Sequence, residues 1–254
     1  MNILFNILAA LFCLILGYIF GSIPTAVWIG KIFFHRDPRL EGSMNSGGTN
    51  AGRLFGKKIG VLVIVLDMIK LIIPVWIAFL MFTYIKFGDK ALCPLPTEYN
   101  QFDMNFEYIV GWPVYWLTVV GCIFGHCYPI FASFKGGKGF SCYMGTMLGT
   151  SWMFGFAPSI LLYFVILKIN KKVSLTDLIM SVILTSISWI WAILMMAGVI
   201  PHDLFLLPMF GPTLMPGWVF SVCATISTVL VFWRHRENIK RIIAGTERTI
   251  SWMK

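Results

Sequence analysis

Long stretches of this 254-residue chain contain no Asp, Glu, Lys or Arg, and this feature limits the fold more than any other. A helix that crosses a bilayer needs about 20 apolar residues. With 58% hydrophobic and 12% charged residues, the composition excludes a disordered chain or an ordinary soluble domain. The sequence predicts an all-α, polytopic membrane helix bundle that forms one domain over residues 1–254. The uncharged stretches are 1–30, 108–134, 139–167, 178–202 and 204–233, and a sixth apolar stretch, 59–85, carries only Asp67 and Lys70.

The N-terminal stretch and the cysteine spacing further limit the class of membrane protein. No Lys or Arg precedes Lys31, whereas a secretory signal starts with a basic region, so we expect 1–30 to be a retained first span. The six cysteines include no CxxC pair, which excludes a zinc knuckle or a thioredoxin-type site. We expect no metal and no cofactor.

The basic residues predict the orientation, because cytoplasmic loops carry an excess of Lys and Arg. Loop 31–58, residues 168–172 and the C-terminal tail are basic, whereas loop 86–107 has two Lys against four acidic residues. Six crossings would put the basic tail on the same side as this acidic loop. The conflict disappears if 139–167 crosses twice, with a turn near 151–158. We therefore predict seven spans in the cell membrane, with the N-terminus outside and the C-terminus in the cytoplasm.

The first polar segment covers residues 42–53 and is rich in Gly, Ser, Thr and Asn. Backbone N–H groups of such a loop can point at an anion, and Arg53 offers a planar fork for a phosphate. An ordinary polar loop of turn residues is the alternative interpretation. The candidate binding residues here are Ser43, Asn45, Gly47, Gly48, Thr49, Asn50 and Arg53.

The second polar segment, 125–139, lies at a predicted membrane boundary. Two Lys that flank two Gly let the backbone approach a phosphate with a cation on each side, although the spacing is not that of a Walker A loop. The alternative is a membrane-flanking loop whose lysines snorkel. The candidates are Lys135, Gly136, Gly137, Lys138 and Gly139, with His126 as structural support.

The third segment, 234–247, follows the last span directly. Asn238 lies three residues after His235 and four after Arg234, so the three share a helical face. Glu237 is expected to pair with Arg241, four residues further on. The alternative is a basic juxtamembrane helix on anionic lipid. The candidates are Arg234, His235, Arg236 and Asn238, with Glu247 as support.

Asp67 and Lys70 stand three apart within an apolar span, where ionisable groups are costly and usually paired. We expect them to pair with each other and to brace loop 31–58.

Together the three segments resemble the bacterial acyl-phosphate:glycerol-3-phosphate acyltransferase family, which reads roughly GSxNxGxTNxxR…DxxKG, GHxxPxFxxFKGGKG and RHRxNIxRxxxGTE. The blocks cover 42–70, 125–139 and 234–247 and keep the family's order. Two departures are Leu71, where the family usually has Gly, and Thr176-Asp177, which do not continue the family pattern that begins at Ser174-Leu175.

The resemblance implies transfer of a fatty acyl group from acyl phosphate to the 1-hydroxyl of sn-glycerol 3-phosphate, which gives lysophosphatidic acid and phosphate at a site facing the cytoplasm. By resemblance, Ser43 and Arg53 act at the transfer centre, and Thr49 and Asn50 help to hold the donor phosphate. Residues 135–139 bind the phosphate of glycerol 3-phosphate, and His235 and Asn238 bind its glycerol or its phosphate. The partners are these two substrates and membrane lipid, without nucleic acid.

Three routes remain open for the hydroxyl proton and the acyl group. His235 can take the proton as a base. Oxygens of the donor's own phosphate can take it instead, or Ser43 can form an acyl-enzyme. A membrane transporter for an anionic solute is the alternative function. It predicts ionisable groups in several spans and an internal repeat, whereas here only one span carries such groups.

Overall fold

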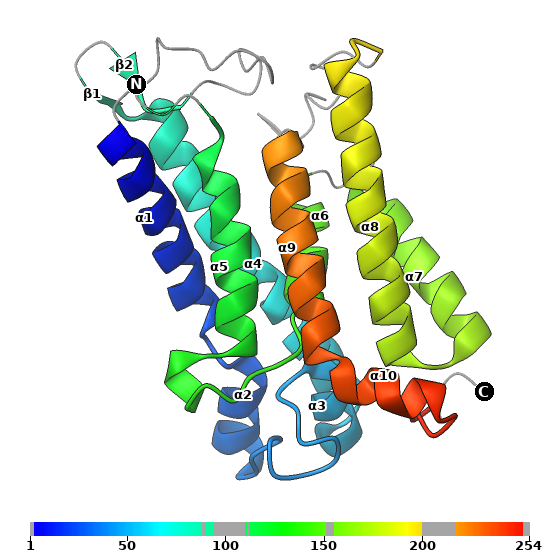
Figure 1. Cartoon of the computed structure of the whole chain (residues 1–254). Helices are drawn as coiled ribbons and strands as arrows, with labels where there is room; N and C mark the ends of the chain where they lie inside the picture. The colour runs from blue at the N-terminus through cyan, green and yellow to red at the C-terminus, as the bar shows by residue number, and fades with distance from the viewer. Residues whose placement is uncertain are drawn as a thin grey trace.

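The computed structural model describes residues 3–87, 90–93, 110, 112–150, 155–199 and 217–250. Its long helices lie side by side and run between two ends of the molecule (Figure 1). In chain order the elements are α1 (Ile3–Gly21), α2 (Thr25–Phe34), α3 (Gly48–Phe55), α4 (Lys57–Tyr84), β1 (Lys86–Phe87), β2 (Lys90–Ala91), η1 (Val114–Trp116), α5 (Leu117–Cys127), η2 (Ile130–Ala132), α6 (Phe140–Thr150), α7 (Ala157–Asn170), α8 (Val173–Met196), α9 (Trp218–Arg234) and α10 (Arg236–Ile243).

Within the described ranges, four helical segments are long and apolar enough to cross a membrane: Ile3–Phe34, Lys57–Tyr84, Val114–Ala132 and Val173–Met196. The bent pair α9–α10 makes a fifth if it is one span. α7 is apolar but has only 14 residues, and α6 has 11. All these helices fall within or overlap the predicted apolar stretches. The count of seven crossings stays a prediction.

Two helices lie within the stretch 139–167, for which the sequence predicts two crossings. α6 ends at Thr150, and α7 begins at Ala157 with Pro158 in its first turn. Proline is tolerated there because the first N–H groups of a helix have no partner within it. Residues 151–154, which hold part of the predicted turn, lie outside the described residues.

The two ends of the bundle differ in chemistry. One end carries a small antiparallel hairpin, in which Lys86 pairs with Ala91 and Phe87 with Lys90; the other elements of the described residues are helices, as the all-α prediction requires. α2, α3 and α10 lie at the opposite end (Figure 1), where the backbone of Ile250 also bonds to Lys171. The basic segments therefore gather at the end opposite the hairpin. Most of the acidic loop 86–107 and all of loop 203–216 lie outside the described residues.

α1 and α5 approach each other backbone to backbone through glycines. A Cβ on Gly17 would lie 2.1 Å from the carbonyl oxygen of Thr118, and one on Gly121 would lie 2.2 Å from that of Leu14. Small residues at a four-residue spacing allow such contact between membrane helices, and Gly17–Gly21 and Gly121–Gly125 both have that spacing. This packing fixes the position of the C-terminal end of α5, from which the second polar segment continues.

A buried ion pair stabilises the break between α1 and α2. Lys70 Nζ lies 2.9 Å from Asp67 Oδ1 and donates a hydrogen bond of 2.9 Å to the carbonyl oxygen of Ile23. Thr25 Oγ1 donates to Asp67 Oδ1 at 2.5 Å. Pro24 interrupts the helix here, and the pair joins both sides of the break: Lys70 bonds the carbonyl oxygen of Ile23, and Asp67 accepts from the hydroxyl of Thr25 at the start of α2. The expected pair is present, but it braces the α1–α2 junction rather than loop 31–58.

Candidate active site

The loop before α3 is wrapped around one buried amide. Asn50 Nδ2 donates to the carbonyl oxygen of Pro38 at 2.7 Å and to that of Asn45 at 3.1 Å, and Asn50 Oδ1 accepts from the backbone N–H of Ser43 at 2.8 Å. The amide is therefore committed to the loop itself. It positions Ser43 and leaves no free donor for a ligand.

Part of the predicted loop is a helix, since α3 begins at Gly48 and not after Arg53. Glycine lowers the stability of an isolated helix, but packing requires it at Gly48. A Cβ on Gly48 would lie 2.8 Å from the carbonyl oxygen of Gly60 in α4. The first N–H groups of a helix carry a partial positive charge and bind anions. The anion-binding feature expected of a loop is thus supplied by a helix N-terminus.

The second polar segment folds against His126. The backbone N–H of Gly137 bonds to the carbonyl oxygen of His126 at 3.0 Å, and a Cβ on Gly137 would lie 2.0 Å from His126 Nε2. Arg234 contacts the segment from behind, with Nε 3.1 Å from the carbonyl oxygen of Gly137 and Nη2 3.2 Å from that of Gly136. These contacts hold Lys138 in place.

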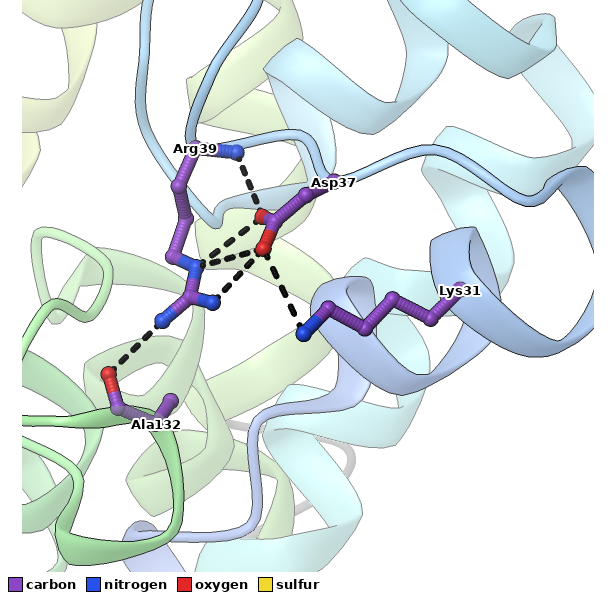
Figure 2. Close-up of polar contacts among 4 residues, drawn as sticks. All are labelled: Lys31, Asp37, Arg39 and Ala132. Carbon is purple, nitrogen blue, oxygen red and sulfur yellow. Dashed lines mark hydrogen bonds and ion pairs between the residues drawn. The ribbon is translucent and has the colours of Figure 1, made fainter.

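A cross-link joins the first loop to the second segment (Figure 2). Arg39 Nη1 donates to the carbonyl oxygen of Ala132 at 2.7 Å, while Nη2 and Nε bind Asp37 at 2.6 and 2.9 Å. Lys31 Nζ lies 3.7 Å from the same carboxylate. The hydrogen bonds from Arg39 lower the pKa of Asp37 to about 2, so this cross-link keeps its charges at neutral pH.

The third segment bends by 62° between α9 and α10, with His235 at the junction. Beyond α10 the chain returns so that Glu247 accepts hydrogen bonds from Ser174 Oγ at 2.5 Å, Asn238 Nδ2 at 2.7 Å and Arg241 Nε at 2.8 Å. The expected pair of Glu237 with Arg241 is wrong. Arg241 turns to Glu247, and Glu237 lies 3.2 Å from Lys240 instead.

The three segments meet around one pocket of about 250 Å³. The predicted residues outside its wall are Lys135, Gly136, Gly137, Arg234, His235 and Arg236. The lining residues are Gly42, Ser43, Met44, Asn45, Gly47, Gly48, Thr49, Asn50, Arg53, His126, Lys138, Gly139, Phe140, Ser141, Val173, Ser174, Asp177, Asn238, Arg241, Glu247 and Arg248.

The pocket is cationic. Its lining includes four Lys or Arg side chains and two carboxylates. Burial lowers the pKa of Lys138 to about 8. Burial also lowers the pKa of Arg53, and the nearby Arg248 lowers it further. Burial is the largest cause of both shifts, so an anionic ligand that pairs with these cations would offset the cost of burying their charge.

Glu247 is the anion that holds the tail. Burial raises its pKa, but the hydrogen bonds from Ser174, Asn238 and Arg241 outweigh that effect and leave the pKa below its ordinary value. The carboxylate is therefore ionised at neutral pH. This is the supporting role expected for Glu247.

His235 lies behind the pocket wall and is fully buried. Its Nδ1 is 2.8 Å from the carbonyl oxygen of Val231, so Nδ1 carries the hydrogen. Its Nε2 faces Asp177 Oδ2 at 3.5 Å and has no hydrogen-bond partner among the described residues. Sequence reasoning missed Asp177. The available signal was an acid one turn into an apolar span, where the sequence departs from the family pattern.

Three groups in the interior have the chemistry to hold a metal ion. Potential ligand atoms of Asp67, His126 and Cys142 all lie within 4.8 Å of one another. The ammonium of Lys70 and the hydroxyl of Thr25 both contact Asp67 Oδ1, whereas Oδ2 has no hydrogen-bond partner among the described residues. Because an internal cation already balances this carboxylate, the group fits a structural ion pair better than a metal centre.

Fold and site define a helical membrane protein with a cation-lined pocket at one end of its bundle. The glycerol-3-phosphate acyltransferase family model matches residues 11–245, and the chain belongs to this family of acyltransferases.

Relatives across the full length agree with this assignment. The chain is 34% identical over 241 residues to the glycerol-3-phosphate acyltransferase of Enterococcus faecalis, covering 94% of this chain and 91% of the relative. It is also 34% identical over 245 residues to that of Staphylococcus carnosus, covering 94% and 97%.

Two solved structures share the fold. The glycerol 3-phosphate form of PlsY (YgiH), an integral membrane glycerol 3-phosphate acyltransferase, superposes with a TM-score of 0.66 at 28% identity and covers 95% of this chain and 96% of that one. The lysophosphatidic acid form gives a TM-score of 0.64, again at 28% identity, with 95% of each chain covered.

Proposed function

We propose that this acyltransferase moves a fatty acyl group from acyl phosphate to the 1-hydroxyl of sn-glycerol 3-phosphate, and that it releases lysophosphatidic acid and phosphate. The observation that carries the proposal is the cation-lined pocket in which the three polar segments meet. Both substrates bear phosphate groups that repel each other. Four cations against two carboxylates supply the charge needed to hold the two groups close together.

We propose a division of this pocket between the substrates. The N-terminus of α3 and Arg53 hold the donor phosphate, because a helix N-terminus and a guanidinium both favour phosphate oxygens. Lys138 and Asn238, which line the same pocket, hold the acceptor. Ser43, whose backbone is fixed by Asn50, serves as a hydrogen-bond donor for the oxyanion that develops at the carbonyl.

The proposed chemistry has one displacement step. The acceptor hydroxyl oxygen bonds to the acyl carbon, the bond from that carbon to the phosphate oxygen breaks, and the departing phosphate takes the hydroxyl proton. His235 is disfavoured as a direct base, because its unpartnered Nε2 is fully buried and Asp177 stands between it and the pocket. A Ser43 acyl-enzyme is disfavoured because the bond that fixes Ser43 is made by its backbone N–H, and within the described part of the chain no His, Asp or Glu side chain bonds its hydroxyl.

We also propose seven spans, with the polar end and this site in the cytoplasm. The basic segments 31–58 and 168–172 and the C-terminal tail lie at one end of the bundle, which supports this orientation under the positive-inside rule. Fluorescence of a protein fused to the C-terminus, compared with alkaline phosphatase activity at the same point, tests it. Phosphatase activity without fluorescence would reverse the orientation.

The function is tested by phosphate release from purified protein given palmitoyl phosphate with and without glycerol 3-phosphate. We expect release to require both substrates and to fall at least about 100-fold in Arg53→Ala, because the phosphate loses a charge-assisted contact. Arg36→Ala is the matched control, since Arg36 is an exposed arginine paired with Glu41. Equal release without glycerol 3-phosphate would indicate hydrolysis, and no release by folded wild type would contradict the proposal.

A further inference from the structure

The carboxylate of Asp177 is placed in the pocket wall and keeps a hydrogen-bonding capacity that the proposed mechanism does not use. It lies near the start of α8, and its side chain is 13% exposed. Tyr163 Oη, from α7, donates to Oδ1 at 2.9 Å. Oδ2 has only the long 3.5 Å contact with His235 Nε2 among the described residues.

The neighbours of Asp177 fix the carboxylate without neutralising it closely. The ring of Tyr163 is stacked on Phe140, with centroids 5.6 Å apart, so the hydroxyl that binds Oδ1 is anchored. His235, at the end of α9, lies on the other side of the carboxylate, and its ring is held by the hydrogen bond from Nδ1 to the carbonyl oxygen of Val231. On the pocket side the charged residues are Lys138 from the second segment and Arg241, Glu247 and Arg248 from the C-terminal segment, besides Arg53.

A carboxylate in a cationic pocket discriminates between parts of one ligand. It accepts hydrogen bonds only and repels phosphate oxygens, whereas it attracts hydroxyl hydrogens. A ligand with a phosphate at one end and hydroxyls at the other therefore has one favoured direction in this pocket. Its phosphate faces the cations, and its hydroxyl faces Asp177.

We propose that Asp177 accepts a hydrogen bond from a hydroxyl of the glycerol phosphate acceptor and so sets the direction in which this substrate binds. Tyr163 and His235 are positioning residues for that carboxylate. The inference deepens the proposed function and rests on it for the identity of the acceptor. It assigns a specificity-determining contact to a residue that departs from the family pattern.

The test is calorimetric titration of purified protein with two probes, glycerol 3-phosphate and inorganic phosphate, in the absence of any acyl donor. In Asp177→Asn we expect the Kd for glycerol 3-phosphate to rise about tenfold or more, because a charge-assisted hydrogen bond is lost. We expect inorganic phosphate to bind as tightly as before or more tightly, since a repelling charge is gone. Opposite responses of this kind are not produced by a general disturbance of the fold.

Two further variants complete the experiment. Glu237→Gln removes one negative charge from the same end of the molecule at an exposed position on α10, so it should leave both Kd values unchanged. Tyr163→Phe should weaken glycerol 3-phosphate binding in the same direction as Asp177→Asn but by less, with the KM for acyl phosphate unchanged.

Two results would overturn the inference. One is a parallel change in both Kd values, and the other is no change in either. The proposed function is tested separately. If wild type binds glycerol 3-phosphate but transfers no acyl group, the proposed reaction fails and the Asp177 contact stands.

Discussion

Two buried aspartates in this molecule each face a histidine, and their surroundings give them different roles. Asp67 is fully buried, with Lys70 Nζ at 2.9 Å, the Thr25 hydroxyl at 2.5 Å and His126 Nδ1 at 3.6 Å. Asp177 has a neutral tyrosine hydroxyl on one oxygen and His235 at 3.5 Å from the other. Among the described residues both carboxylates keep one oxygen without a hydrogen bond, but Asp67 is neutralised by Lys70 inside the helix packing and serves the fold, whereas Asp177 lines the pocket and serves a ligand.

The two aspartate–histidine pairs also differ in what the histidine touches. His126 lies against Gly137 and is part of the pocket wall, so the structural pair around Asp67 supports the site from behind. His235 is fully buried and reaches the site only through Asp177. The pair at Asp67 is thus organised around the ammonium of Lys70, and the pair at the pocket around the carboxylate of Asp177.

The largest expected effect separates the pairs by stability. Asp67→Asn leaves the ammonium of Lys70 buried without its anion, and removing one partner of a buried pair costs about 3–5 kcal/mol. Asp177→Asn should cost about 1 kcal/mol or less, because the asparagine oxygen still accepts from Tyr163. Thermal unfolding of both variants in detergent measures the difference. Equal losses would show that the two aspartates do not have distinct roles.

A second expected effect links the structural pair to the pocket. In Gly137→Ala the new Cβ would lie 2.0 Å from His126 Nε2, so either the imidazole or the segment that carries Lys138 must move. A displacement of about 1 Å can reduce catalysis about 100-fold, and we expect a loss of this order in kcat/KM.

The matched control for this glycine is Gly149→Ala. A Cβ there meets Ile72 at an ordinary 3.4 Å, so wild-type activity is expected. If Gly137→Ala were as active as this control, His126 would not support the pocket.

A smaller effect is expected from pH. The pKa of Lys138 is lowered to about 8, so the ammonium that we propose holds the acceptor phosphate is charged below pH 8 and lost above it. The KM for glycerol 3-phosphate should therefore rise about tenfold between pH 7 and pH 9, while the substrate phosphate stays doubly ionised. Steady-state kinetics of Lys138→Arg, whose guanidinium stays charged, should lack this rise. The same rise in both proteins would assign it to another group.

The smallest effect is expected at a third acid pair, Asp37 with Arg39, in which the side chains of both partners are partly exposed. Arg39→Gln removes the hydrogen bond to Ala132 and the pairing with Asp37, which together link the first loop to the second segment. We expect a loss of about 1 kcal/mol and a several-fold rise in KM for glycerol 3-phosphate, measured by unfolding and steady-state kinetics. A loss as large as that of Asp67→Asn would contradict this order.

Much of this arrangement was readable from the sequence because its physical causes are local. Uncharged stretches predict apolar helices, and spacing predicts the Asp67–Lys70 pair. The glycine spacings at 17–21 and 121–125 are a further local signal of close helix packing.

What the sequence could not show depends on contacts between distant segments. Whether the side-chain amide of Asn50 bonds a ligand or the backbone of its own loop depends on carbonyl oxygens up to twelve residues away in the sequence. Arg241 pairs with Glu247 and not with Glu237, which is nearer in sequence, because the chain turns back after α10. Asp177 becomes part of the site only when α7, α8 and α9 come together.

The most direct test of the account compares two lysines that the sequence treats alike. Lys138 lines the pocket, whereas Lys135 is exposed and lies outside its wall. We would measure kcat/KM for formation of lysophosphatidic acid from palmitoyl phosphate and glycerol 3-phosphate in Lys138→Ala and Lys135→Ala. The account expects a loss of at least about 100-fold for Lys138→Ala and less than about threefold for Lys135→Ala. Equal losses, or a larger loss at Lys135, would contradict the pocket as the place where the three segments act together.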